Sequence, residues 1–281
     1  MAHVVSQPTP PFQAANGAYE VHQIPAAQDN LIWLLVCKRT GAAAVVDGPN
    51  AEGVLAYAKQ HGITLTHVLN THTHPDHTGV NVELQKLGLL DQLKVLGPAK
   101  AARDVPGLTQ PVDEGDQIEI GAAKARVMRT EGHIVGHVCF VFDDVLFSGD
   151  TLFTGGCGRV FTGDFAAMHD GLTRLSKLDP SLRVCCGHEY TEDNLRFALS
   201  LEPSSRALEE RYQRVRETRA TGASAVPSLL GEELATNPML RSDSPELIAS
   251  VRAQAQDADL STALGVFTAT RKLKDSGAYK R

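Results

Sequence analysis

The chain has 281 residues, of which 42% are hydrophobic and 21% charged, so it can bury a sizeable core and is not extensively disordered. Its net charge of −6, without a basic run, argues against nucleic acid as a partner. No apolar stretch reaches the ~20 residues of a membrane span, and the N-terminus does not resemble a signal peptide. We therefore expect a cytoplasmic monomer with no membrane partner. Its five cysteines are expected to be buried free thiols.

The first 18 residues contain the proline-rich segment PTPPF and are expected to form a flexible extension, 1–18. Short apolar runs then follow at turn-like spacing, with a helix expected at 50–60 and a second set of runs after residue 90. This pattern predicts an α/β catalytic domain at 19–190, built from two packed sheets with helices outside. The expected strands are YEVHQI, LIWLLVC, AAAVVD, THVLN, KVLG, QIEI, ARVMRT, HVCFVF, VLFS and RVCC.

The sequence changes character from about residue 190. The segment TEDNLRFALSLEPSSRALEERYQRVRETRA alternates apolar and charged residues at helical spacing, and we expect no strand after it. In SPELIASVRAQA, Ser244 is placed to cap a helix whose first turn contains Pro245. Residues 191–281 are therefore predicted to form a smaller helical domain packed on the first.

The segment THTHPDHTG follows the predicted strand THVLN and is rich in groups that bind metals. It contains His72, His74, Asp76 and His77, and a loop at a strand end can bring such side chains together. These four ligands exceed what one tetrahedral ion takes from a single loop, so two ions are predicted.

Three further candidate ligands follow predicted strands in the same way. His133, Asp150 and His188 each come after an apolar run and next to a glycine, which allows a sharp turn. His137 is a candidate for orienting a ligand. The remaining histidines lack such neighbours and are interpreted as ordinary surface or core residues: His3, His22, His61, His67 and His169.

The H-x-H-x-D-H loop with the later His, Asp and His resembles the metallo-β-lactamase superfamily, whose fold is an αββα sandwich with metals at one edge. Within it, the chain is similar to the glyoxalase II family, the hydroxyacylglutathione hydrolases. The resemblance extends over residues 19–281, including the helical domain, which is expected to bind substrate. It rests further on SGDTLFTGGCGRVF, CGHEYTEDNLRFA, NPMLR and RKLKD.

The resemblance implies two divalent metal ions, with zinc favoured and iron or manganese as alternatives. One ion would be held by His72, His74 and His133. The other would be held by Asp76, His77 and His188, with Asp150 bridging the two.

The implied activity is hydrolysis of S-D-lactoylglutathione to D-lactate and glutathione, the second step of methylglyoxal detoxification. Metal-bound hydroxide would attack the thioester, with Asp76 and Asp150 as catalytic residues. A thiolate leaves readily because its thiol has a pKa of ~8.5, so no Ser-His-Asp triad is needed. Cys157 shows no base partner in the sequence and is not expected to be a nucleophile. The residue spacing does not select lactoyl over another small 2-hydroxyacyl group.

The resemblance also implies a glutathione pocket between the domains. Arg271 and Lys274 are three residues apart and would share one helix face, although a basic C-terminus is as often a solvated tail. The implied pocket residues are Arg159, Phe161, Tyr190, Arg271 and Lys274.

Four positions depart from the family pattern, and the departures bear on glutathione affinity rather than on hydrolysis. Phe161 stands where the family commonly has tyrosine, and Arg159 replaces a usual lysine. Pro75 replaces a frequent bulky aromatic residue, and Glu131 begins EGHI where proline is usual before Gly-His.

Two other classes of protein remain alternatives. One is another enzyme of the superfamily, such as a persulfide dioxygenase with a single iron; a β-lactamase is less favoured because of the extra helical domain. The other is a non-catalytic metal-binding module, although a structural zinc site is normally closed by four protein ligands.

Overall fold

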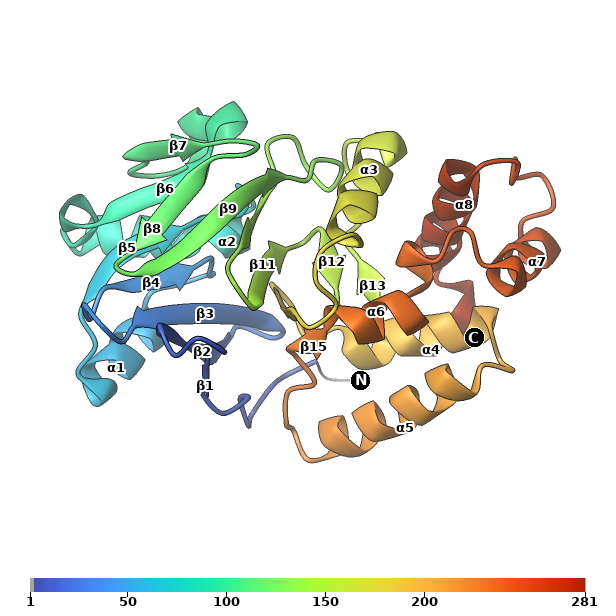
Figure 1. Ribbon diagram of the computed structural model, residues 1–281, viewed down its shortest axis with the longest axis horizontal. Coiled ribbons are helices and arrows are strands. Elements are labelled where there is room, and N and C mark those ends of the chain that lie inside the picture. Colours follow the sequence, from blue (N-terminus) through green and yellow to red (C-terminus); the bar gives the residue numbers. More distant parts are fainter. Residues whose placement is uncertain (1–2, 281) are drawn as a thin grey trace.

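The computed structural model describes residues 3–280, in which two β-sheets pack face to face beside a group of helices (Figure 1). The first sheet has seven strands in the order of the chain, antiparallel from β1 to β4 and parallel from β4 to β7. Its strands are β1 (Phe12–Gln13), β2 (Tyr19–Ala26), β3 (Asn30–Cys37), β4 (Ala43–Val46), β5 (Leu65–Leu69), β6 (Lys94–Pro98) and β7 (Gln110–Val112).

The second sheet has six strands in the order β15-β14-β11-β10-β9-β8. Only β11 and β14 pair in parallel. A separate hairpin, β12–β13, follows β11. The strands are β8 (Gln117–Ile120), β9 (Ala123–Arg129), β10 (Val138–Val141), β11 (Val145–Gly149), β12 (Leu152–Phe153), β13 (Gly156–Cys157), β14 (Arg183–Cys186) and β15 (Ser228–Leu229).

Helices cover the outer faces of both sheets. The α-helices are α1 (Glu52–His61), α2 (Pro75–Lys86), α3 (Phe165–Leu175), α4 (Thr191–Leu201), α5 (Arg206–Ala220), α6 (Leu230–Thr236), α7 (Pro245–Gln254) and α8 (Ala263–Ser276). The short 3₁₀ helices are η1 (Leu90–Gln92), η2 (Ala99–Asp104), η3 (Pro238–Leu240) and η4 (Ala278–Lys280).

Three apolar layers hold the sandwich together. The layer between the sheets contains Trp33 and Phe147, and the Trp33 Nε1–H donates to the Cys186 carbonyl across it at 2.9 Å. A second layer joins the first sheet to α1 and α2, and a third joins the second sheet to α3 and the C-terminal helices. The predicted αββα layering is confirmed, because apolar strands alternate their side chains between an inner and an outer layer.

Each of the ten predicted strands coincides with a strand of the structure. In β9 the burial alternates along AKAR, as expected for a strand with one solvated face. The strands that sequence reasoning missed, β1, β7, β12, β13 and β15, have two or three residues each and are too short to show a period. The five cysteines are buried and free, as predicted.

The N-terminal segment differs from the prediction. Residues 3–18 lie against the body of the molecule, and β1 pairs with β2. Thr9 donates its N–H to the Gln23 side chain at 2.9 Å and its hydroxyl to the Val226 carbonyl at 2.6 Å. The expectation of a flexible extension is therefore wrong for residues 3–18. The polar groups of this segment form hydrogen bonds with residues far away in the sequence, which composition does not reveal.

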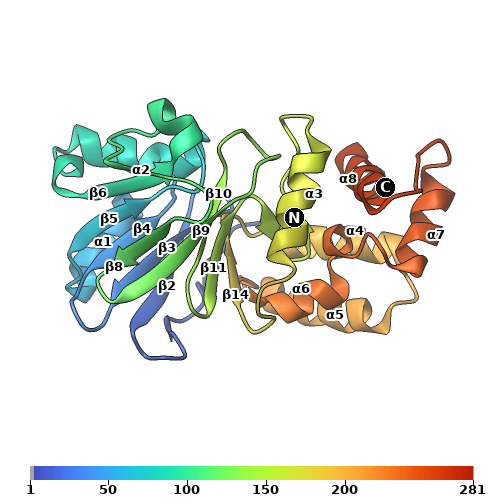
Figure 2. The ribbon, with the colours of Figure 1, turned by 45° about the horizontal axis from the view of Figure 1, so that its top comes forward.

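The C-terminal helices α4 to α8 lie on the side of the second sheet, beyond α3 (Figure 2). Ser244 caps α7 by accepting from the Leu247 N–H, with Pro245 in the first turn, as predicted. The expectation of no further strand is wrong, since β15 pairs with β14 and joins this region to the second sheet. Within residues 3–280, no helix has the length and apolarity that a membrane crossing requires.

Candidate metal centre and substrate pocket

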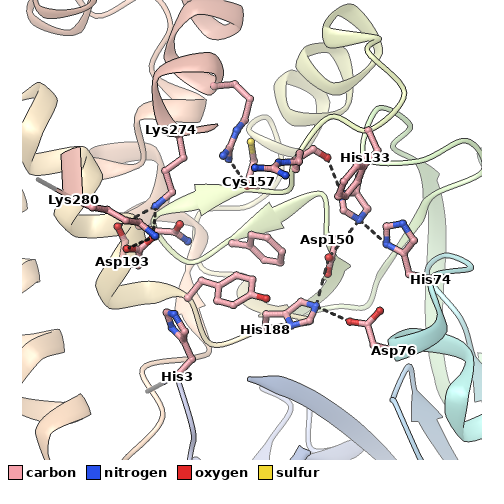
Figure 3. Close-up of a pocket in the computed structure, with 16 residues that line it drawn as sticks. His3, His74, Asp76, His133, Asp150, Cys157, His188, Asp193, Lys274 and Lys280 are labelled. Atoms are coloured by element: carbon pink, nitrogen blue, oxygen red, sulfur yellow. Dashed lines mark hydrogen bonds and ion pairs between the residues drawn. The ribbon is translucent and has the colours of Figure 1, made fainter. Parts of the chain in front are cut away.

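The seven predicted ligands come from the segments that follow β5, β9, β11 and β14, and Asp76 and His77 lie in the first turn of α2 rather than in a loop. Figure 3 shows five of them together: His74, Asp76, His133, Asp150 and His188. His74 lies just before α2, and Pro75 occupies the first position of that helix. Two glycines permit the close approach of these loops. Gly132 has a φ of +122°, and a Cβ on Gly187 would lie 2.6 Å from the His77 ring.

The first cluster consists of His72, His74, His133 and Asp150, whose ligand atoms lie within 4.8 Å of one another. His74 Nδ1 lies 3.1 Å from His72 Nε2 and 3.0 Å from His133 Nε2. Asp150 Oδ2 lies 3.4 Å from His133 Nε2. Three imidazole nitrogens and a carboxylate thus face a common point, a donor set that suits zinc, iron or manganese.

The second cluster consists of Asp76, His77 and His188, again within 4.8 Å. The Nε2 atoms of His77 and His188 are 3.2 Å apart. Asp150 reaches this cluster as well, with Oδ1 at 3.4 Å from His77 Nε2 and Oδ2 at 3.5 Å from His188 Nε2. Asp150 therefore lies between the clusters, and its Oδ1 is buried without a hydrogen-bond partner among the described residues.

Four of the imidazoles are turned so that Nε2 faces the cluster. In each, Nδ1–H donates to an oxygen outside it, which leaves the Nε2 lone pair inward. The pairs are His72 with Thr71 Oγ1 at 3.0 Å, His77 with Asp47 Oδ2 at 3.0 Å, His133 with the Arg159 carbonyl at 2.8 Å and His188 with Asp29 Oδ1 at 2.8 Å.

The electrostatics of the site favour cations. Burial, reinforced by neighbouring histidines, holds the pKa of His72 well below its usual value. Its neutral ring can therefore offer a nitrogen lone pair to a metal ion. Burial alone would also lower the pKa of His188, but Asp150, Asp29 and Asp76 raise it to about 10. These carboxylates thus attract positive charge, as protons on imidazole or as metal ions. The residues present therefore fit a site for two divalent ions.

Sequence reasoning missed the residues that orient the ligands. Asp47 accepts from Thr71 N–H at 2.8 Å as well as from His77, and it completes a third group of possible ligands with His72 and His77. Like Asp150, it lies directly after a strand and next to a glycine, and this is the signal that could have found it. Asp29 lies in a β-turn with no such signal.

His137, the candidate for orienting a ligand, contacts the backbone of one predicted ligand. Its Nε2 accepts the Asp150 N–H at 3.1 Å, so the ring holds the backbone of the residue between the two clusters. Its Nδ1 lies 3.1 Å from both Thr130 Oγ1 and Thr151 Oγ1. Burial keeps the pKa of His137 far below its usual value, which agrees with this acceptor role.

The clusters open into a cavity of ≈ 490 Å³ between the sandwich and the C-terminal helices. The five predicted pocket residues all line it: Arg159, Phe161, Tyr190, Arg271 and Lys274. Arg271 and Lys274 lie on α8, as the predicted helix requires. The Tyr190 ring stacks on His188 with centroids 4.9 Å apart, so this wall of the cavity directly contacts one of the predicted metal ligands.

The cations of the cavity are held by protein partners. Arg271 donates to the Cys157 carbonyl at 2.9 Å and to Asp275 at 2.8 Å, and Lys274 contacts Asp193 at 2.8 Å. Burial raises the pKa of Cys157 despite the nearby Arg271, which disfavours a thiolate nucleophile. The basic groups are thus preorganised beside the cavity rather than a solvated tail.

The structure shows the surroundings of two residues that depart from the family pattern, Phe161 and Glu131. Phe161 is 60% exposed at the rim, with its ring edge-on to His74 and His133. Glu131 pairs with Lys100 at 2.7 Å and accepts the Gly136 N–H at 3.0 Å, so it braces the loop that carries His133.

The remaining histidines divide into two groups. His22, His61, His67 and His169 do not line the cavity, in agreement with their interpretation as ordinary residues. His3 is different, because it lines the cavity beside Tyr190. Its interpretation as an ordinary surface or core residue stays a prediction, and the contact between positions 3 and 190 could not be read from the sequence.

Family comparisons agree with this geometry. The model of the metallo-beta-lactamase superfamily matches residues 29–188, which places the fold and the site in that class. A second model, described as hydroxyacylglutathione hydrolase C-terminus, matches residues 189–277. Within the superfamily, the chain belongs to the hydroxyacylglutathione hydrolase family.

Individual relatives lead to the same result. A hydroxyacylglutathione hydrolase of Rhodospirillum rubrum is 43% identical over 258 residues, which cover 91% of this chain and 98% of the relative. One of Methylococcus capsulatus is 45% identical over 230 residues, 81% of this chain and 89% of the relative. The crystal structure of a metallo-beta-lactamase from Staphylococcus aureus superposes with a TM-score of 0.61 at 21% identity, covering 92% of this chain and 71% of that one. At that identity the structure supports the fold alone.

Proposed function

We infer that the chain is a metal-dependent thioesterase that hydrolyses S-D-lactoylglutathione to D-lactate and glutathione. The observation that carries this inference is the pair of metal-ligand clusters joined by Asp150 at the end of a cavity lined with Arg271 and Lys274. Family membership supports the same activity. The substrate carries carboxylates, which the cations of the cavity attract.

The metal-ligand roles are part of this proposal. His72, His74 and His133 would hold one ion and Asp76, His77 and His188 the other, with Asp150 shared; zinc is favoured, with iron and manganese as alternatives. Bound divalent ions would supply Lewis acidity and lower the pKa of water to ~7. Among the chain's own groups, the carboxylates of Asp150 and Asp76 would hold the ions and the reacting water in position.

The substrate roles divide between the two parts of the chain. We assign residues 19–190 to catalysis and 191–281 to substrate binding, with Arg271 and Lys274 placing one of the two glutathione carboxylates. Arg159 is 57% exposed at the mouth and pairs with Asp275 at 3.3 Å, so its guanidinium is placed to contact the ligand from the rim. Phe161 and Tyr190 form apolar walls, which shield the thioester from bulk water.

The alternatives fit less well. A persulfide dioxygenase with one iron would leave the second cluster of Asp76, His77 and His188 without a purpose. A non-catalytic module would not need a cavity that opens onto the clusters. A β-lactamase would leave the matched C-terminal region unexplained.

The test is steady-state hydrolysis of S-D-lactoylglutathione by protein of measured metal content. Wild type with two metals per chain should turn the substrate over, and His74→Ala should lose this activity. His61→Ala, a histidine on the exposed end of α1, is the control. Absence of turnover at two metals per chain would refute the assignment of this substrate.

The contribution of Arg271 can be separated from the chemistry. Arg271→Ala should raise KM for glutathione thioesters by about tenfold and leave kcat much less affected, because it removes a charge-assisted contact to the carrier. Lys272→Ala, the exposed neighbour on α8, should change neither. An equal effect on a short uncharged thioester would remove Arg271 from the carrier site.

A pH dependence is expected from Lys274. Burial lowers its pKa to about 8 even though Asp193 opposes the shift, so its charge is present at pH 7 and lost as pH rises through 8. KM for S-D-lactoylglutathione should therefore rise between pH 7 and 9, up to about tenfold if only the ammonium form binds. Lys274→Arg keeps its charge in this range and should flatten the profile. An unchanged slope in that variant would contradict the assignment.

A further inference from the structure

A smaller cavity of ≈ 280 Å³ adjoins the substrate cavity on the side away from the metal clusters. The two cavities share three lining residues, His3, Asp193 and Lys280, which come from the two ends of the chain and from α4. Figure 3 shows these residues at the end of the pocket opposite His74 and Asp76. A ligand that extends from the reacting centre past Lys274 would therefore enter this side pocket.

His3 is held in place by the helical region. The Arg219 guanidinium of α5 donates to the carbonyls of His3 at 3.1 Å and Val4 at 2.9 Å. The imidazole Nδ1 lies 3.1 Å from the Glu189 carbonyl, which can only accept, so Nδ1 carries the proton. In the tautomer with the proton on Nδ1, Nε2 is an acceptor, and it has no partner within residues 3–280.

The charges of the side pocket are unevenly paired. Asp193 is contacted by Lys274 at 2.8 Å, Arg196 at 2.8 Å and Lys280 at 3.4 Å, so three cations share one carboxylate. Glu192 also lines the side pocket, and its carboxylate has no ion pair or hydrogen bond in the described part of the chain. Acidic and basic residues line the pocket in equal number, so it combines cations such as Lys280 and Arg196 with two acceptors that have no partner among the described residues, Glu192 and His3 Nε2.

We propose that this side pocket binds the zwitterionic α-amino-acid end of the substrate's thiol carrier. Glu192 and His3 Nε2 receive the ammonium group, while Lys280 and Arg196 receive the carboxylate. The inference rests on the proposed function, because the γ-glutamyl residue of glutathione supplies such an end. It makes the N-terminal segment a determinant of specificity.

The test compares the binding of S-hexylglutathione with that of its N-acetylated form, which lacks the ammonium group. By calorimetry on the metal-loaded protein, wild type should bind the unmodified ligand about tenfold more tightly. Glu192→Gln and His3→Ala should each lose much of this preference, and His3→Gln, which keeps an acceptor, should retain more of it. Glu217→Gln, an exposed glutamate on α5, should match wild type. Thermal unfolding checks that the variants are folded.

Equal binding of the two ligands by wild type would overturn the side pocket, and so would a preference that survives in both Glu192→Gln and His3→Ala. Hydrolysis of S-D-lactoylglutathione, measured in parallel, reports on the proposed function separately. Turnover without a ligand preference would refute the side pocket alone. A preference without turnover would support the side pocket and refute the hydrolase assignment.

Discussion

Replacing Asp150 by asparagine should lower kcat/KM on the order of 10³-fold, because the variant loses the one carboxylate placed between both metal clusters. Each Asp150 oxygen lies 3.4 Å from a histidine nitrogen of a different cluster. An amide is neutral and offers only one acceptor oxygen, so it cannot join two cations in the same way. Metal analysis should accordingly find fewer than two ions per chain.

The substitution Asp150→Asn keeps the size of the side chain, so the metal-free variant should unfold at nearly the temperature of metal-free wild type. Asp143→Asn, an exposed position in the turn between β10 and β11, is the matched control and should retain full activity and metal content. Full activity of Asp150→Asn with two ions bound would show that Asp150 does not bridge the centre.

The sequence carries a strong signal for the seven clustered residues for a physical reason. Each of His133, Asp150 and His188 follows a strand, and polar side chains in loops after buried strands lie at the edge of the sheet. The order of the strands then brings the three residues together. His72 lies in the loop after β5 and His77 in the first turn of α2, so they are close in sequence and their proximity needs no tertiary knowledge. Layering follows equally from the alternation of apolar residues.

The residues that support the site carry a weaker signal, since among Asp29, Asp47 and His3 only Asp47 directly follows a strand. Asp29 lies in a turn and Asp47 directly after β4, and their pairing with His188 and His77 depends on contacts 159 and 30 residues apart. His3 contacts Tyr190 in a segment whose backbone is held by long-range contacts, among them the hydrogen bond from Arg219 of α5 to the His3 carbonyl. Such long-range polar contacts depend on the assembled tertiary structure and are not encoded in any local pattern.

The β12–β13 hairpin shows how the helical region reaches the active site. Asn194 donates to the Thr154 carbonyl at 3.0 Å, and Asn237 donates to the Gly156 carbonyl at 3.0 Å. Glu233 accepts the Gly155 N–H at 2.7 Å. The hairpin leads directly to Arg159 at the mouth of the cavity. The NPMLR segment therefore has a structural role. Its asparagine, Asn237, fixes the hairpin, and the cavity residue Arg159 comes shortly after that hairpin in the chain.

Arg211→Ala should lower the free energy of unfolding by about 3–5 kcal/mol, since it leaves the Glu233 carboxylate buried without its cation. Both side chains are almost fully buried, with exposed fractions of 2% for Arg211 and 0% for Glu233, and the guanidinium contacts the carboxylate directly. Urea unfolding of the metal-loaded protein gives the measurement. Arg206→Ala, on the same helix with 90% of the side chain exposed, should have little effect.

A second substitution identifies the cause of the loss. Adding Glu233→Gln to Arg211→Ala removes the uncompensated charge while keeping an acceptor for the Gly155 N–H, so the double variant should be more stable than Arg211→Ala by at least about 1 kcal/mol. Without the second substitution, the unpaired Glu233 also strains the hairpin it holds. Activity of Arg211→Ala should therefore decline more than that of the double variant. A double variant no more stable than Arg211→Ala would show that lost packing, rather than the buried charge, dominates.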